Sequence, residues 1–127
     1  MKIGITARGN NLDSEVDPRF GRCEYFIIVD PDTLEFEVVE NFSMEAASGA
    51  GVQSGQLVAT KGVEAVLTGN IGPNAFQVLQ AAGIKVITGV SGKVEEAIEK
   101  YKRGEFKPVE SSNVDSKFGI LEEREEG

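Results

Sequence analysis

Short apolar runs and helical stretches alternate along this chain, and together they predict five strands and three helices. Strands are expected where β-branched and aromatic residues form runs or alternate with polar ones, over residues 2–7, 24–30, 35–40, 65–68 and 84–88. Helices are expected where helix-compatible sequence is closed by a glycine, over residues 52–61, 73–82 and 94–103. The predicted order is therefore βββαβαβα.

This order predicts a single α/β domain built on a mixed sheet. The first three strands follow one another closely enough to form an antiparallel meander, whereas the last two are reached through helices and run parallel to the first. Right-handed crossovers then place residues 2–7 in the centre of a five-stranded sheet of order 3-2-1-4-5, with helices on both faces.

One edge of this sheet is predicted to collect the loops that bind a ligand. With the strands directed as above, residues 8–23, 41–51, 69–72 and 89–92 all lie at the edge where the parallel strands end. Open α/β sheets bind their ligands outside the carboxyl ends of the parallel strands. Several arginines, the lone cysteine and the glycine-rich segments fall in these loops, so we expect the functional site here.

Composition and charge narrow the function classes. The chain has 127 residues, 13 of them basic and 21 acidic, and its net charge of −8 argues against binding to nucleic acid backbones. It has no histidine and one cysteine, which excludes an intrachain disulfide and histidine-based catalytic triads. No apolar run approaches the roughly 20 residues of a membrane span. The sequence starts directly with a predicted strand, so a cytoplasmic location is expected.

Cys23 is the first candidate for chemistry. As a thiolate it could bind a soft metal or one iron of a cluster, and the neighbouring Arg19 and Arg22 would lower its pKa. The alternative interpretation is a small buried hydrophobic residue at the start of a strand. Met44, in the second loop, is interpreted as a solvent-side or packing residue rather than a soft ligand.

Two glycine-rich loops are the second candidate. Residues 49–51 precede a predicted helix, where backbone N–H groups can bind an anion, and residues 69–74 form a strand-to-helix turn that could line the same site. The loop of residues 49–51 has neither the spacing of a phosphate-binding loop nor that of a dinucleotide fingerprint. A flexible hinge and a tight turn are the alternative interpretations. The candidate binding residues are thus Arg22, Cys23, Gly49, Ala50, Gly51, Asn70 and Gly72.

Several segments carry a resemblance to a known family: Asp-Pro-Arg-Phe-Gly-Arg at 17–22, residues 25–30, Asn41, Gly-Ala-Gly at 49–51 and Gly-Asn-Ile-Gly-Pro-Asn-Ala at 69–75. Over roughly residues 1–105 the chain resembles the dinitrogenase iron–molybdenum cofactor biosynthesis family, which is related to nitrogen fixation. The resemblance covers nitrogenase accessory factor X and the C-terminal domain of the cofactor-building protein B. It implies a ribonuclease-H-like α/β fold and the binding or carrying of an iron–sulfur–molybdenum cofactor or its precursor, rather than catalysis.

The resemblance divides the chain into two parts. Residues 1–107 are expected to form the cofactor-biosynthesis-like domain. Residues 108–127 carry six acidic and two basic residues and lose the helical periodicity, so a mobile acidic tail that adds little stability is expected there.

Three functions follow from these observations. The favoured one is a non-enzymatic binding or carrier protein for an iron–sulfur(–molybdenum) cofactor or related anionic metal cluster, with Cys23 as metal ligand. Its partners would be the cluster and proteins of cofactor assembly, with neither nucleic acid nor membrane. The alternative is a protein-interaction module of the same fold without a cluster. A nucleic-acid hydrolase is disfavoured because residues 2–7 and 65–69 contain no carboxylate to hold metal ions.

Overall fold

The computed structural model describes residues 1–42 and 49–113 of the chain. Its elements run β1 (Ile3–Ala7), β2 (Tyr25–Val29), β3 (Phe36–Glu40), α1 (Ala50–Ala59), β4 (Ala65–Leu67), α2 (Pro73–Ala81), β5 (Lys85–Ile87) and α3 (Val94–Lys102). The predicted order of strands and helices is confirmed. Within the described residues, no helix is both long enough and apolar enough to cross a membrane.

The five strands form one mixed sheet of order β3-β2-β1-β4-β5, as predicted. β1 is central and pairs antiparallel with β2, where Ile5 lies opposite Ile27, and parallel with β4, where Ile5 lies opposite Leu67. β3 adds to β2 antiparallel and β5 adds to β4 in parallel. This is the single-domain α/β arrangement that the ribonuclease-H-like resemblance implies.

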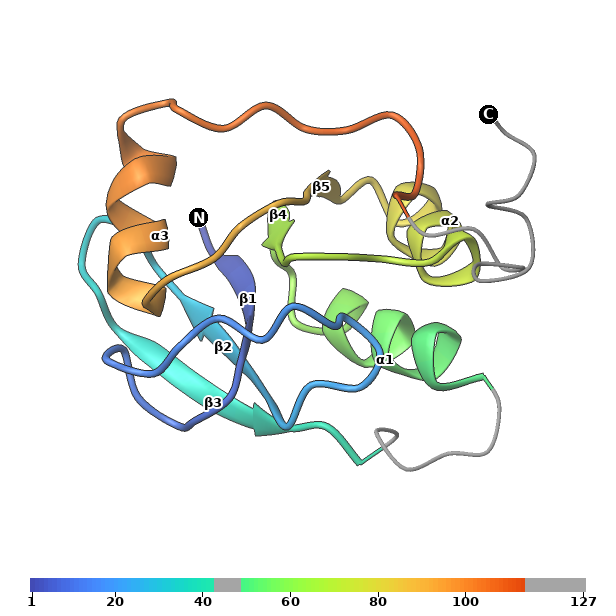
Figure 1. The fold of residues 1–127 in the computed structure, drawn as a ribbon, viewed down its shortest axis with the longest axis horizontal. Coiled ribbons are helices and arrows are strands. Elements are labelled where there is room, and N and C mark those ends of the chain that lie inside the picture. The colour runs from blue at the N-terminus through green and yellow to red at the C-terminus, as the bar shows by residue number, and fades with distance from the viewer. Residues whose placement is uncertain (43–48, 114–127) are drawn as a thin grey trace, which may run out of the picture.

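The sheet separates two apolar cores, because side chains alternate between the faces along each strand. Ile27 and Val29 of β2 face the core that α3 covers, whereas Phe26 and Ile28 face the core under α1 and α2. Figure 1 shows α1 and α2 side by side on one side of the sheet and α3 on the other. β1 is buried along its whole length, which its near-continuous apolar sequence requires.

The one clear difference from the predicted boundaries lies at the start of α1. The helix begins at Ala50, two residues before the predicted start, directly after Gly49 with φ 76°. Small residues along α1 allow it to lie close to α2: a Cβ on Gly51 would lie 3.2 Å from the Ala75 Cβ, and one on Gly55 would lie 3.0 Å from the Val78 Cγ1. The segment read as a loop is therefore the first turn of a closely packed helix.

The chain beyond α3 returns to the sheet. The Val109 N–H donates a hydrogen bond of 2.8 Å to the Val86 carbonyl on β5, and Asn113 bonds to the loop after β4. The first part of the predicted tail is therefore attached to the domain over residues 108–113. Residues 114–127, which make up the rest of that tail, lie outside the described residues.

Candidate functional site

The predicted sheet edge contains a hollow of about 330 Å³ in which α1 and α2 begin. We call it the helix-start hollow. Its lining comes from the turn before β2 and from the first turns of both helices: Gly21, Arg22, Gly49, Ala50, Gly51, Val52, Gly72, Pro73, Asn74 and Ala75. Three segments far apart in sequence thus meet at one place, and none of these lining residues is acidic.

Neither helix end at the hollow is capped by a side chain. The N-cap residues are Gly49, in a left-handed conformation, and Gly72, in an extended one, and neither helix has an acidic residue in its first turn. Pro73 fills the first position of α2, where its missing N–H costs nothing. The remaining first-turn N–H groups and the positive ends of both helix dipoles therefore face the hollow without a neutralising charge among the described residues.

Glycines bring the three segments of the hollow into backbone contact. A Cβ on Gly21 would lie 3.1 Å from both the N and the Cα of Gly51, closer than side chains normally pack. In the neighbouring loop, a Cβ on Gly69 would lie 2.7 Å from the Pro18 Cα. Any side chain at these positions would push the Arg22 turn away from the helix starts, so the glycines set the width of the hollow.

A second hollow of about 200 Å³ adjoins the first, sharing Gly21 and Gly72 with it. We call it the Arg19 hollow. Arg19 there is 60 % exposed, yet its Nε and Nη2 donate to the buried Asp17 carboxylate at 3.1 and 3.2 Å. The hydrogen bonds and the charge of Asp17 raise the pKa of Arg19. Asp17 thus fixes a guanidinium at the site while compensating most of its charge.

Asn70 also lines the Arg19 hollow. Its backbone N–H and its side-chain Nδ2 both donate to the Pro18 carbonyl, at 2.7 and 3.1 Å, and its own carbonyl accepts from the Phe20 N–H. These bonds tie the loop after β4 to the Asp17–Arg22 segment. Asn70 therefore holds two walls of the site together.

Cys23 lies behind the site and not in it. Its side chain is fully buried in the core under α1 and α2, and its thiol donates to the Phe20 carbonyl at 3.4 Å. Burial, reinforced by the charge of Asp17, raises the pKa of this thiol, so the thiolate form is disfavoured at neutral pH. The expectation that Cys23 faces the same cleft as Arg22 is wrong, because the turn that exposes Arg22 points Cys23 into the core.

A buried polar pair positions that turn. The Asn41 Nδ2 donates to the Cys23 carbonyl at 2.9 Å, and the Ser54 hydroxyl of α1 donates to the Asn41 Oδ1 at 3.0 Å. Both side chains are buried. The pair links the end of β3, the start of β2 and α1. Sequence reasoning missed Ser54, because a serine within a predicted helix gives no signal that it is buried.

The structure therefore sorts the predicted site residues into three groups. Five of them line the helix-start hollow: Arg22, Gly49, Ala50, Gly51 and Gly72. Asn70 lines the adjoining hollow and Cys23 is buried behind both. Met44 lies outside the described residues, among which no three His, Cys, Asp or Glu side chains come together to hold a metal ion. The sequence placed Arg19 and the loop of residues 69–74 at this edge of the sheet, but it did not reveal the ion pair between Asp17 and Arg19.

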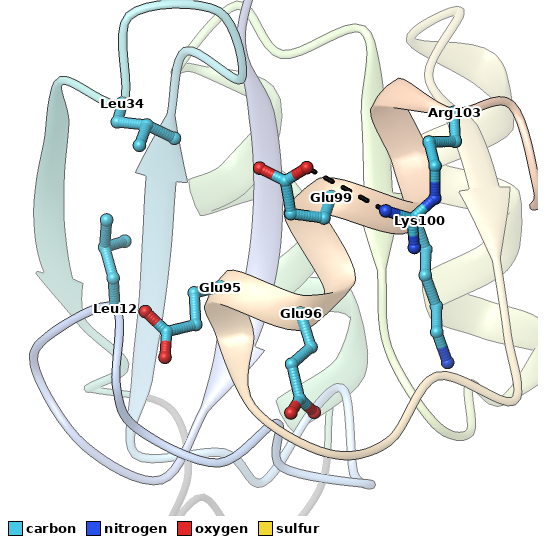
Figure 2. A pocket seen from close by; sticks show the side chains of 7 residues that line it. All are labelled: Leu12, Leu34, Glu95, Glu96, Glu99, Lys100 and Arg103. Carbon is cyan, nitrogen blue, oxygen red and sulfur yellow. Dashed lines mark ion pairs between the residues drawn. The ribbon is translucent and has the colours of Figure 1, made fainter.

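A larger groove of about 650 Å³ lies on the opposite side of the sheet, along α3 (Figure 2). We call it the α3 groove. It is lined by Leu12, Leu34, Glu95, Glu96, Glu99, Lys100 and Arg103. Figure 2 shows the two leucines facing the acidic start of α3, with the Glu99–Arg103 ion pair of 4.0 Å farther along the helix. Its three glutamates make it unsuitable for an anion, in contrast to the helix-start hollow.

Comparison with known proteins agrees with this fold. The sequence model of the family described as "Dinitrogenase iron-molybdenum cofactor" matches residues 1–104. An uncharacterised protein of Methanocaldococcus jannaschii is 34 % identical over 113 residues, covering 87 % of this chain and 92 % of its own.

Two solved structures are similar along most of their length. The apo form of the orange protein from Desulfovibrio gigas has a TM-score of 0.85 and 42 % identity, covering 88 % of this chain and 95 % of its own. A NifB-like protein from Thermotoga has a TM-score of 0.73 and 41 % identity, covering 84 % and 91 %. With its matching family model, sheet order and glycine-rich edge, the chain belongs to the dinitrogenase iron–molybdenum cofactor family.

Proposed function

We propose that this protein is a non-enzymatic carrier that binds an anionic iron–sulfur or iron–sulfur–molybdenum cluster, or its precursor, in the helix-start hollow. The observation that carries the proposal is the convergence of two uncapped helix N-termini and Arg22 on one hollow without an acidic lining residue. In a chain of net charge −8, such a place is suited to an anion.

The chemistry of the lining supports binding rather than catalysis. The described lining residues offer backbone N–H donors, one guanidinium, the Asn74 amide and small apolar surfaces. They include no carboxylate, thiol or imidazole that could serve as a general base or nucleophile. The family description adds that proteins of this kind are associated with the iron–molybdenum cofactor.

The cargo would be held mainly by charge and hydrogen bonds. Cys23 is buried behind the hollow with a protonated thiol, so a cluster in the hollow does not meet a preformed soft ligand there. Metal ligation by Cys23 stays a prediction, because it requires the thiol to lose its proton and the Arg22 turn to open. Binding without a protein–metal bond suits a carrier, since the cluster can leave without breaking a coordinate bond.

Anaerobic reconstitution tests this proposal. The wild-type protein, Arg22→Ala and the control Lys100→Ala are mixed with a synthetic [4Fe–4S] cluster anion capped by thiolates, desalted, and examined by metal analysis and absorption. We expect cluster retention by the wild type and by Lys100→Ala, whose charge lies in the α3 groove, and a loss of at least fivefold for Arg22→Ala. No retention by the wild type, or equal retention by all three proteins, would contradict the proposal.

A protein-interaction module is the second candidate function. It is favoured by the α3 groove, where Leu34 is 44 % exposed beside Leu12 and three glutamates. Isolation of the protein from its native cells would separate the two candidates. A stable complex without iron or molybdenum would support the interaction module, whereas a metal-containing monomer would support the carrier.

A further inference from the structure

The segment after α3 contacts a loop of the proposed site, although it lies outside the residues that match the family model. The match ends at residue 104, but the chain continues along β5, where the Val109 N–H donates to the Val86 carbonyl at 2.8 Å. This contact directs the following residues toward the edge of the sheet at which β4 ends. Asn113 then lies against the loop that connects β4 to α2.

Asn113 uses both ends of its amide on that loop. Its Oδ1 accepts a hydrogen bond of 2.8 Å from the Ile71 N–H, and its Nδ2 donates to the Gly69 carbonyl at 3.2 Å and to the Asn70 Oδ1 at 3.0 Å. One side chain thereby contacts three consecutive residues. The loop is also held by the bonds of Asn70 to Pro18 and Phe20 and by the Gly89 N–H, which donates to the Gly69 carbonyl at 2.9 Å. Asn113 adds the bond to the Ile71 N–H.

We infer that Asn113 is a positioning residue for the anion site, although it lies beyond the residues that match the family model. The inference rests on the proposed function. Its reason is geometric: the residue after Ile71 is Gly72, the N-cap of α2, whose first turn lines the helix-start hollow. Fixing the Ile71 N–H fixes the start of α2 and therefore the direction of its first N–H groups toward an anion.

The chemistry at this position makes asparagine, and not a charged residue, the suitable choice. An aspartate could accept from the Ile71 N–H, but its second oxygen would face the Gly69 carbonyl and the Asn70 Oδ1, which are both acceptors. It would also place a negative charge next to the Arg19 hollow. An alanine would simply remove all three bonds.

Two readouts on four proteins test the inference: the wild type, Asn113→Ala, Asn113→Asp and the control Ser112→Ala, whose hydroxyl makes no hydrogen bond within the described residues. The first readout needs no ligand and is the hydrogen-exchange rate of the Ile71 amide. We expect at least tenfold faster exchange in Asn113→Ala and little change in Ser112→Ala. The second readout is the Kd for the synthetic [4Fe–4S] anion, measured well below the unfolding temperature.

We expect Asn113→Ala to raise this Kd about three- to tenfold at all salt concentrations. Asn113→Asp should raise it further at low salt, with the additional effect shrinking as salt screens the new charge. Unchanged exchange at Ile71 would overturn the role of Asn113 in ordering the loop. Faster exchange with an unchanged Kd would overturn its role in binding. If the wild type itself binds no cluster, the proposed function fails, and the exchange rate still decides whether Asn113 orders the loop.

Discussion

Single glycine positions set the shape of the helix-start hollow. Gly21 lies so close to the backbone of Gly51 that a methyl group cannot enter without moving the Arg22 turn. We therefore expect Gly21→Ala to lower the free energy of unfolding by about 1–3 kcal/mol and to weaken anion binding. Denaturant unfolding and the cluster Kd measure the two effects.

Gly72→Ala is the matched control for this substitution. It lines the same hollow, but an added Cβ meets no atom within 4 Å and its backbone is extended, with φ −82° and ψ 171°. Its cost should stay within about 1 kcal/mol, which comes from the lower preference for alanine at a helix N-cap. Equal losses for Gly21→Ala and Gly72→Ala would show that close backbone contact is not what fixes the hollow.

The buried thiol of Cys23 makes a testable contribution to pH dependence. Its pKa is raised in the folded protein, whereas an unfolded thiol ionises near about pH 8.5. Above that pH the unfolded chain binds fewer protons than the folded one, so the stability present at neutral pH is lost as the pH rises. Between pH 7 and 10 the wild type should lose about 2 kcal/mol more than Cys23→Ala. Parallel pH profiles for the two proteins would contradict a buried, protonated thiol.

The sequence alone distinguishes some, but not all, of the residues that line the site from those that lie in the core. Arg22 and Gly49–Gly51 were predicted at the site because charge and glycine-rich loops are recognisable in sequence. Cys23 follows Arg22 directly, and which of the two faces outward depends on a turn held by Asn41 and Ser54. Those contacts join segments far apart in the chain, which no local pattern reveals.

The order of strands and helices was predictable because each element carries its own signal. β2 is an uninterrupted apolar run, and Pro73 and Gly83 bracket α2. The start of α1 was not predictable, because Ala50 lies between Gly49 and Gly51 and glycine is a poor helix former. The segment becomes helical by packing on α2. The segment after α3 lacks periodicity, so its attachment to β5 through Val109 was also missed.

Two truncations separate the attached segment from the remaining tail. Ending the chain after residue 107 removes the Val109–Val86 bond and the three bonds of Asn113, so the free energy of unfolding should fall by roughly 2–3 kcal/mol. Ending it after Asn113 should change this free energy by less than about 1 kcal/mol. Thermal unfolding measures both, with the larger loss equivalent to a Tm decrease on the order of 10 °C. Equal Tm values for the two truncated chains would show that residues 108–113 add nothing.

The molecule as a whole is negatively charged, whereas the proposed anion site is positive. The chain carries −8, yet the helix-start hollow is lined by Arg22 and two positive helix ends. Salt screens distant charges more than near ones, with a Debye length of about 30 Å at 0.01 M and about 8 Å at 0.15 M. The association rate of a cluster anion should therefore rise with salt over this range. Stopped-flow absorption measures this rate, and a steady fall with salt would show that attraction by the site dominates even at long range.

Truncation also provides a control for this electrostatic prediction. Residues 114–127 contain five acidic and two basic residues, a net charge of −3. Removing them lowers the overall repulsion, so the rise of the association rate with salt should be smaller than in the full chain. If the association rate depends equally on salt in both proteins, the repulsion of the cluster anion comes from the charges of residues 1–113 alone.

The central claim is that an anion binds where α1 and α2 begin, and the Kd of Asn74→Asp tests it most directly. Asn74 is an exposed lining residue in the first turn of α2, where a carboxylate favours the helix by about 0.3–1 kcal/mol. The control Gln80→Glu makes the same charge change farther along α2. Asn74→Asp should be at least as stable as the wild type and yet bind the [4Fe–4S] anion on the order of tenfold more weakly, whereas Gln80→Glu should bind it nearly normally. Equal Kd values for the two variants would contradict an anion site at the helix starts.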